Sequence, residues 1–253
     1  MKLLQELLEE VLNHLPQDGG RSLKNCSLVS KSWLDPSRRL LFANVAIEVE
    51  TCQRFLNTIS PTNTELLRHI HSLTYFAGWN GRHNPRYRVC TLQVYLPSLR
   101  QLRTLALHHM EIEPIIPEHL DLFSAFQHTL STLSFMESSI TWRTFASLVG
   151  YFPNLRNLEI SSSSFGTDGK PVLHPTHPLR GRLWIENMWT HDMATLISRL
   201  PELRPQCEEL VMDGDNCRRL LPIVQNSVRI LTRNRYGYIH FRSVHSLTVS
   251  IGP

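Results

Sequence analysis

The chain has 253 residues, of which 42% are hydrophobic and 19% are charged, and it carries a formal net charge of +4. A chain of this length and apolar content can bury the core of one large domain or of two unequal ones, which excludes an intrinsically disordered polymer. This positive charge is much less dense than that of a dedicated nucleic-acid-binding protein, so the net charge alone does not indicate the kind of partner.

The first 45 residues predict a unit of three short helices. Two neighbouring rows of apolar residues at four-residue spacing predict an amphipathic first helix. The rows are Leu3, Leu7, Val11, Leu15 and Leu4, Leu8, Leu12. Ser22 predicts the cap of a second helix that reaches Trp33, and Asp35 predicts the cap of a third, with Pro36 at its first helical position. We expect residues 1–45 to form one domain and residues 46–253 a second.

Three segments of the helical unit carry a family resemblance. Residues 3–12 read LLQELLEEVL, residues 27–33 read SLVSKSW, and residues 38–42 read RRLLF. In this order they resemble an F-box, although Leu4 stands where that family usually has proline. The resemblance implies docking to a Skp-type adaptor of a cullin-RING ubiquitin ligase. The residues that it assigns to adaptor contact are Leu4, Leu7, Leu8, Leu12, Leu28, Val29 and Trp33.

Beyond Phe42 a leucine-centred pattern recurs along the chain. It follows an alternating strand over residues 45–49 and a capped helix over residues 51–59. The leucines at the centre of each copy are Leu73, Leu105, Leu133, Leu158, Leu183, Leu210 and Leu247. Their spacings of 32, 28, 25, 25, 27 and 37 residues lie around the roughly 20 to 29 residues of leucine-rich repeats. Residues 141–151 and 190–200 predict helices between these strands, and a weaker copy of the pattern is expected at residues 228–231.

We therefore predict a mixed α/β fold, in which a three-helix F-box precedes an irregular leucine-rich-repeat solenoid with parallel strands on its concave face. Alternation along each strand places every second side chain on that face. The side chains nominated by this rule are Ala106, His108, Ser134, Met136, Glu159, Ser161, Trp184, Glu186, Val211 and Asp213. Those predicted to contact a protein substrate are His108, Met136, Glu159, Trp184 and Asp213.

Trp184 is the predicted centre of this substrate surface. A large aromatic side chain at an outward strand position is typical of an interaction hot spot. The alternative is that the proline-rich stretch at residues 171–178 folds over the indole.

Catalytic and metal-binding patterns are missing from the sequence. The 13 histidines include close pairs at 69/71, 108/109 and 174/177, but no pair is joined by further Cys or His residues at zinc-site spacing. The serines at 161–164 lack a G-x-S-x-G elbow, and the glycines form no phosphate-binding loop. We predict no enzyme activity, no catalytic residue, no metal and no cofactor.

The cysteines and the hydropathy pattern indicate a compartment. Five scattered cysteines without a C-x-x-C pair argue against a disulfide framework, which favours the reducing cytoplasm or nucleus. No segment approaches the roughly 20 apolar residues of a membrane-spanning helix, so no membrane partner is expected.

The predicted function is that of a substrate-recruiting adaptor in a Skp-cullin-F-box ubiquitin ligase. The helices would bind the Skp-type subunit, and the repeats would bind an unidentified protein substrate. Binding both to one chain would raise the effective concentration of the substrate near the ubiquitin carrier. One alternative is a scaffold without ubiquitin function, whose F-box has decayed at Leu4. A less favoured alternative is nucleic-acid binding by residues 229–242, which interleave arginines with aromatic side chains but also fit a degenerate strand pair.

Overall fold

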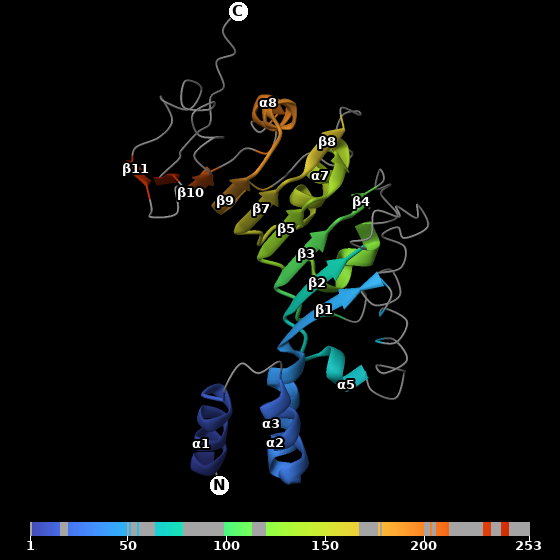
Figure 1. The fold of residues 1–253 in the computed structure, drawn as a ribbon, viewed down its shortest axis with the longest axis vertical. Helices are drawn as coiled ribbons and strands as arrows, with labels where there is room; N and C mark the ends of the chain where they lie inside the picture. Colours follow the sequence, from blue (N-terminus) through green and yellow to red (C-terminus); the bar gives the residue numbers. More distant parts are fainter. Residues whose placement is uncertain are drawn as a thin grey trace, which may run out of the picture.

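The chain is long in one direction, with helices at one end and a stack of strands above them (Figure 1). It is known from a computed structural model. The residues that it describes are 2–15, 20–49, 51, 55, 64–77, 99–112, 120–166, 177, 179–199, 203, 206–212, 230–233 and 239–242. Together they form a mixed α/β structure built on a mostly parallel sheet.

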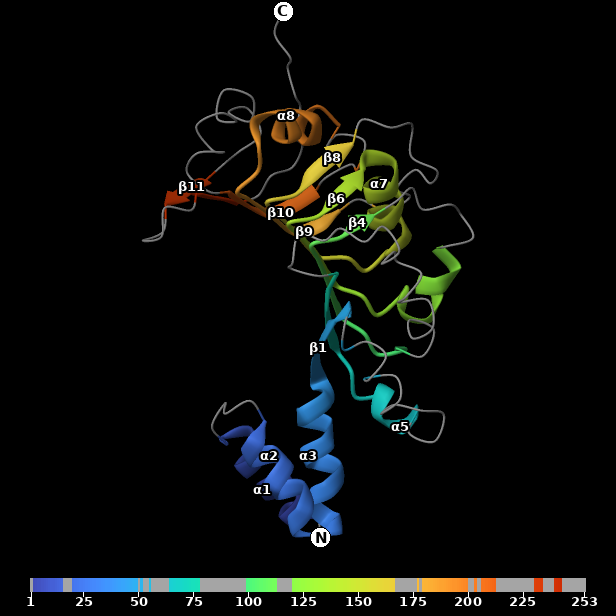
Figure 2. The same cartoon turned by 45° about the vertical axis from the view of Figure 1, so that its right-hand side comes forward.

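Three helices occupy the N-terminal end, namely α1 (Lys2–Asn13), α2 (Arg21–Val29) and α3 (Lys31–Ala43). Helices α2 and α3 lie side by side in both cartoon views (Figures 1 and 2). Arg39 of α3 donates a hydrogen bond to Glu9 of α1 at 2.7 Å, which ties the first helix to the third. Leu8 and Leu12 are buried on the same helix α1, so one of its two predicted apolar rows forms core.

The break between α2 and α3 differs from the prediction. It falls at Ser30, which is extended (φ −162°), and Pro36 lies inside α3 rather than at its start. The Oγ atoms of Ser30 and Ser32 are 2.7 Å apart at the break. Pro36 is buried, and we attribute its place inside the helix to tertiary packing that outweighs its lost hydrogen bond. The predicted cap Ser22 lies within α2, which begins after Gly20.

Nine strands form the main sheet. In spatial order they are β1 (Asn44–Glu48), β2 (Ser72–Phe76), β3 (Thr104–His108), β5 (Thr132–Met136), β7 (Asn157–Ser161), β9 (Arg180–Glu186), β10 (Gln206–Met212), β12 (Ile239–Arg242) and β11 (Ile230–Arg233). The first seven run parallel and follow the order of the chain. The last two pair antiparallel, which corrects the expectation of parallel strands there. Residues 234–238 are too few for the crossover of a dozen or more residues that a parallel pair needs.

The predicted leucine anchors share one level of the sheet. Leu73, Leu105 and Leu133 are direct partners on neighbouring strands, and the same level continues through Leu158, Leu183 and Leu210. All six are buried. Leu247 lies outside the described residues. The spacing of the leucines therefore predicted the strand register, because equivalent residues of successive units stack across a parallel sheet.

The helices that follow the strands cover one face of this sheet. They are α5 (Thr64–Leu67), the 3₁₀ helix η4 (Asp121–Phe126), α7 (Trp142–Tyr151) and α8 (Thr190–Arg199). Figure 2 shows all four on the same side. Buried residues of these helices and of the strands belong to one hydrophobic core cluster. The predicted helices at 141–151 and 190–200 are confirmed, while of the predicted helix at 51–59 Thr51 and Phe55 alone are described. The opposite face carries no helix among the residues that the structure places.

A regular turn follows each central strand. His109, Glu137, Ser162 and Asn187 come directly after β3, β5, β7 and β9, and each has φ between 48° and 53°. The first three turns lead to the short strands β4 (Glu111–Ile112), β6 (Ser139–Thr141) and β8 (Ser164–Gly166), which pair in parallel as a second sheet. The fourth turn, at Asn187, leads directly to α8.

Buried serines join these turns to one another. The Oγ of Ser163 accepts from the N–H of Ser138 at 3.3 Å and donates to the carbonyl of Phe135 at 3.2 Å. Ser138 repeats the arrangement one unit earlier, accepting from Met110 N at 3.2 Å and donating to Leu107 O at 3.1 Å. The hydroxyls therefore satisfy backbone groups that would otherwise be buried without partners.

We expect Ser163→Ala to lower the free energy of unfolding by about 1 to 3 kcal/mol, because it leaves the N–H of Ser138 without its acceptor. Urea denaturation followed by circular dichroism measures the change. Ser139→Ala, at the exposed first position of β6 next to Ser138, should stay within about 0.5 kcal/mol of the parent. Equal losses in the two variants would contradict a structural role for the buried hydroxyl.

The helical end joins the sheet without a linker, since α3 ends at Ala43 and β1 begins at Asn44. Asp35 of α3 also faces two residues that follow α5. Its carboxylate lies 3.7 Å from the Arg68 guanidinium and 3.6 Å from Nε2 of His69. These contacts fix the helices against the first units of the sheet.

Burial of His69 makes the junction sensitive to acid. Desolvation lowers the pKa of His69 below its ordinary value of 6.5, although the Asp35 carboxylate opposes the shift. The unfolded chain therefore binds more protons than the folded chain as the pH falls below about 6.5, and stability decreases in that window. We expect the urea midpoint to fall less between pH 7.5 and pH 5.5 in His69→Gln than in the parent. His128→Gln, at an exposed histidine, should keep the parent's pH dependence.

Candidate functional site

Large apolar side chains are exposed on the first two helices. Leu7 and Val11 of α1 are 60% and 51% exposed, and Leu28 and Val29 of α2 are 83% and 67% exposed. Leu7 and Val11 are one helical turn apart and share a face, whereas Leu28 and Val29 are adjacent at the end of α2. Exposed apolar side chains gathered on short helices are typical of a protein-docking surface.

The residues assigned to adaptor contact fall into different environments. Leu7, Leu28 and Val29 are exposed and accessible to a partner. Leu8 and Leu12 are buried at 9% and 2% exposure, so in this chain they form the core of the helical unit. Trp33 is half-buried in α3. The side chain of Leu4 lies outside the described residues.

The open face of the main sheet carries the residues predicted from strand alternation. One level contains Ala106, Ser134, Glu159, Trp184 and Val211, each paired with the next across neighbouring strands. Ala106, Ser134 and Val211 are buried, whereas Glu159 and Trp184 are half-buried. The adjacent level contains His108, Met136, Ser161 and Glu186. The predicted substrate residues His108, Met136, Glu159 and Trp184 thus occupy one face, while Asp213 lies outside the described residues. Whether a substrate binds them stays a prediction.

Trp184 is held in place by its neighbours on this face. The guanidinium of Arg182 lies 4.4 Å from the centre of the indole, and the indole N–H donates to Glu186 at 3.2 Å. Arg182 also pairs with Glu209 of β10 at 3.4 Å. The indole is therefore half-buried and engaged in intramolecular contacts, which limits its availability to a partner. The proline-rich stretch proposed to cover it lies outside the described residues, apart from His177.

At the other end of this face, His108 is partly buried against an aromatic ring. Its imidazole lies 4.5 Å from the ring centre of Phe76, and burial lowers its pKa below 6.5. Met136, one strand further, is 37% exposed. Phe76 and Met136 therefore give this end of the face an apolar character.

Arginines at the start of the strands were not predicted as functional residues. Arg103 and Arg156 occupy the same position, directly before β3 and β7, and Arg180 begins β9. All three are exposed. The backbone positions of Arg103 and Arg156 are equivalent, because Arg103 O and Arg156 O each accept a hydrogen bond from the next strand. Arg180 lies one residue before the equivalent position on β9, which is Gly181. The repeated Leu-Arg-x-Leu at 102–105 and 155–158 was the sequence signal for this row.

Within the described part of the chain, no group of three or more His, Cys, Asp or Glu residues is placed to hold a metal ion. The close pair His108 and His109 does not converge on one site, since Nδ1 of His109 lies 3.1 Å from the Glu137 carboxylate while His108 contacts Phe76. None of the helices that the structure places is long and apolar enough to cross a membrane.

The arginine-rich segment near the C-terminus forms a strand pair where it is described. β11 and β12 are antiparallel, with Thr232 opposite His240 and Leu231 opposite Phe241. Arg229, Arg235, Tyr236 and Tyr238 lie outside the described residues. This pairing corresponds to the alternative interpretation of the segment as a degenerate strand pair.

Comparison of the chain with protein-family models, curated proteins and solved structures finds no significant match.

Proposed function

We propose that the chain is an F-box type adaptor, which binds a Skp-type subunit of a ubiquitin ligase through α1 and α2. One observation carries the proposal. Six large hydrophobic side chains are exposed among the described residues, and four of them, Leu7, Val11, Leu28 and Val29, lie on these two helices. Leu28 and Val29 belong to the segment SLVSKSW that resembles the family. A surface that exposes apolar side chains of this size is favoured where a partner covers it.

The proposal includes a leucine-rich-repeat solenoid as the substrate-binding part. In support, residues 130–140 follow the spacing L-x-x-L-x-L-x-x-N/C-x-L of such repeats, with Phe135 at the third leucine position, Ser138 at the polar position and Ile140 at the last. Residues 155–165 follow the same spacing, with Ile160 at the third leucine position, Ser163 at the polar position and Phe165 at the last. The two serines at the polar position have the same structural role, because each forms hydrogen bonds with backbone groups of the preceding unit.

The mechanism is proximity rather than catalysis. The direct passage from α3 into β1 and the contacts of Asp35 with Arg68 and His69 make the helices and the sheet one connected body. A substrate on the open face of the sheet would then be held at a defined position relative to the adaptor. This raises its effective concentration at the ubiquitin carrier without any covalent step on this chain.

Co-expression of the full chain with a Skp-type adaptor, followed by size-exclusion chromatography, tests the proposal. We expect one peak that contains both chains in a 1:1 ratio. A folded chain that elutes without the adaptor would contradict the ligase function. The scaffold alternative would then be favoured, since Leu8 and Leu12 are buried and Leu4 replaces the usual proline.

A further inference from the structure

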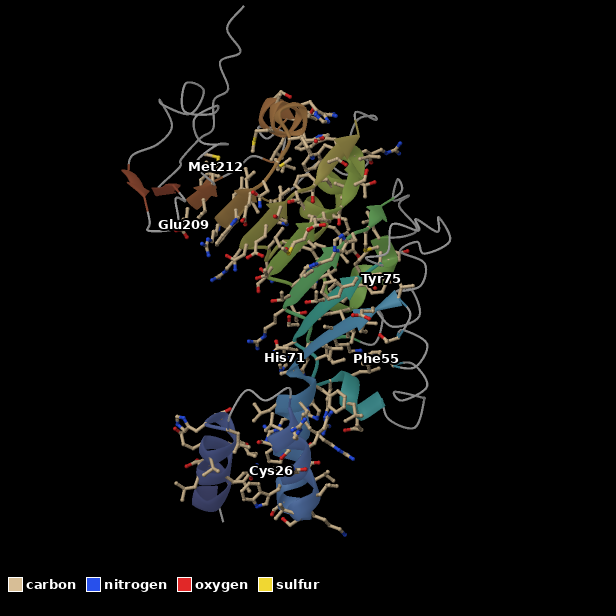
Figure 3. All side chains as sticks on the ribbon, viewed as in Figure 1. Cys26, Phe55, His71, Tyr75, Glu209 and Met212 are labelled. Carbon is tan, nitrogen blue, oxygen red and sulfur yellow. The ribbon has the colours of Figure 1, made fainter. Side chains whose placement is uncertain are left out.

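The edge of the main sheet where the parallel strands begin is basic. Arg103 and Arg156 precede β3 and β7, Arg180 begins β9, and Arg100 lies in the turn before β3. All four side chains are exposed, and none has an ion-pair partner among the described residues. Nitrogen-tipped side chains project from this edge, at the left ends of the strands in Figure 3.

Between β3 and β9 the described part of this edge lacks acidic side chains, and the next strand, β10, carries Glu209 opposite Arg182. Residues 99–103, 127–131, 153–156 and 179–181 contain no Asp or Glu. The other carboxylates lie further along the strands, with Glu159 in the middle of the open face and Glu137 and Glu186 at the ends of the strands. The positive potential is therefore confined to one narrow strip and is bounded by negative charge.

The spacing of the arginines fits one extended chain. Neighbouring strands are about 4.8 Å apart, so Arg103 and Arg156, two strands apart, are separated by about 10 Å, and Arg180 lies one strand further. An extended peptide rises about 3.3 Å per residue, so about five residues would cross from β3 to β9. Acidic side chains along such a peptide can reach each guanidinium in turn and form charge-assisted hydrogen bonds.

We propose that this row of arginines binds an acidic, extended peptide segment of a partner protein. A peptide fits better than a nucleic acid for two reasons. The described edge segments contain no Phe, Tyr or Trp on which bases could stack. In addition, Glu159 and Glu186 would repel a polyanion broad enough to extend onto the open face. A role of this arginine row in binding a ligase substrate rests on the proposed function, whereas binding of a peptide to the row requires no adaptor.

Fluorescence anisotropy with the full chain tests the inference. The probe is a fluorescein-labelled ten-residue peptide of alternating aspartate and serine, compared with a lysine-serine peptide and a ten-nucleotide single-stranded DNA. We expect the aspartate peptide to bind most tightly and its affinity to fall as salt is raised. Arg103→Gln, Arg156→Gln and Arg180→Gln combined should weaken it by roughly tenfold or more.

A matched variant removes three exposed positive charges from the helical end, by Arg21→Gln, Lys24→Gln and Arg38→Gln. It should bind the aspartate peptide within roughly twofold of the parent, because the same net charge is lost away from the edge. Lysine in place of the three edge arginines should retain most of the affinity, which separates loss of charge from loss of folding. Equal weakening in both glutamine variants, tighter binding of the DNA, or no binding of the aspartate peptide by the parent would overturn the inference. A failed adaptor co-elution leaves these results unaffected, so the two proposals fail separately.

Discussion

Phe145→Ala is expected to lower the free energy of unfolding by about 3 to 5 kcal/mol, the largest loss of stability that we predict for a single substitution. Phe145 of α7 is fully buried. Its ring lies 5.7 Å from that of Phe135 on β5, 5.1 Å from that of Phe165 on β8 and 5.4 Å from that of Trp142. One side chain therefore joins the main sheet, the second sheet and the covering helix, and its truncation leaves a cavity that none of the three can close alone.

Urea denaturation of the full chain measures this loss. Phe76→Ala is the control, since Phe76 lies half-buried on the open face against His108 and should cost about 1 kcal/mol or less. The difference between the two phenylalanines tests which face of the sheet forms the core. Similar losses would show that the packing around Phe145 contributes no more than an ordinary surface contact.

The periodic parts of the fold could be predicted from the sequence because their signal is repeated. Leu105, Leu133 and Leu158 recur at spacings of 28 and 25 residues, and the structure places them at one level of the sheet. Strand alternation then correctly placed Trp184 on the face opposite the leucine anchors, whereas Ser134, at the same level, is only 3% exposed. Each of these inferences needed sequence spacing and backbone geometry alone.

Features that depend on tertiary contacts could not be predicted in this way. The helix break at Ser30 replaced the expected break at Asp35, because Pro36 is accommodated inside a packed helix. The burial of Leu8 and Leu12 likewise depends on how α1 packs, since the two apolar rows of that helix are equivalent in sequence.

The candidate site was predicted in composition but not in detail. Alternation placed Trp184 on the open face. Its contacts with Arg182 and Glu186, each two residues away on the same strand, could not be predicted, because the sequence does not show which neighbouring side chains will meet. The arginine row was visible as a repeated Leu-Arg-x-Leu. The sequence did not show that these arginines lie together, because only the strand register places them at one edge of the sheet.

Replacing Leu28 and Val29 together by lysine is expected to weaken adaptor binding by roughly 100-fold or more, because truncation of interface anchors costs about 2 kcal/mol or more each. Both side chains are exposed, so their removal takes little from the core. Lysine suits the end of α2, since a positive charge there interacts favourably with the helix dipole. Pull-down of a purified Skp-type adaptor at several chain concentrations measures the change.

The matched control replaces the other two exposed large hydrophobic side chains, Met136 and Trp189, by lysine. It adds the same charge and removes a similar apolar surface, but both positions lie on the sheet side of the molecule rather than on α1 or α2. Retention of adaptor by this variant and loss by the Leu28 and Val29 variant would assign docking to the helices. Equal retention by both would exclude the end of α2 from the interface, and equal loss would mean that exposed apolar surface is bound without regard to its position.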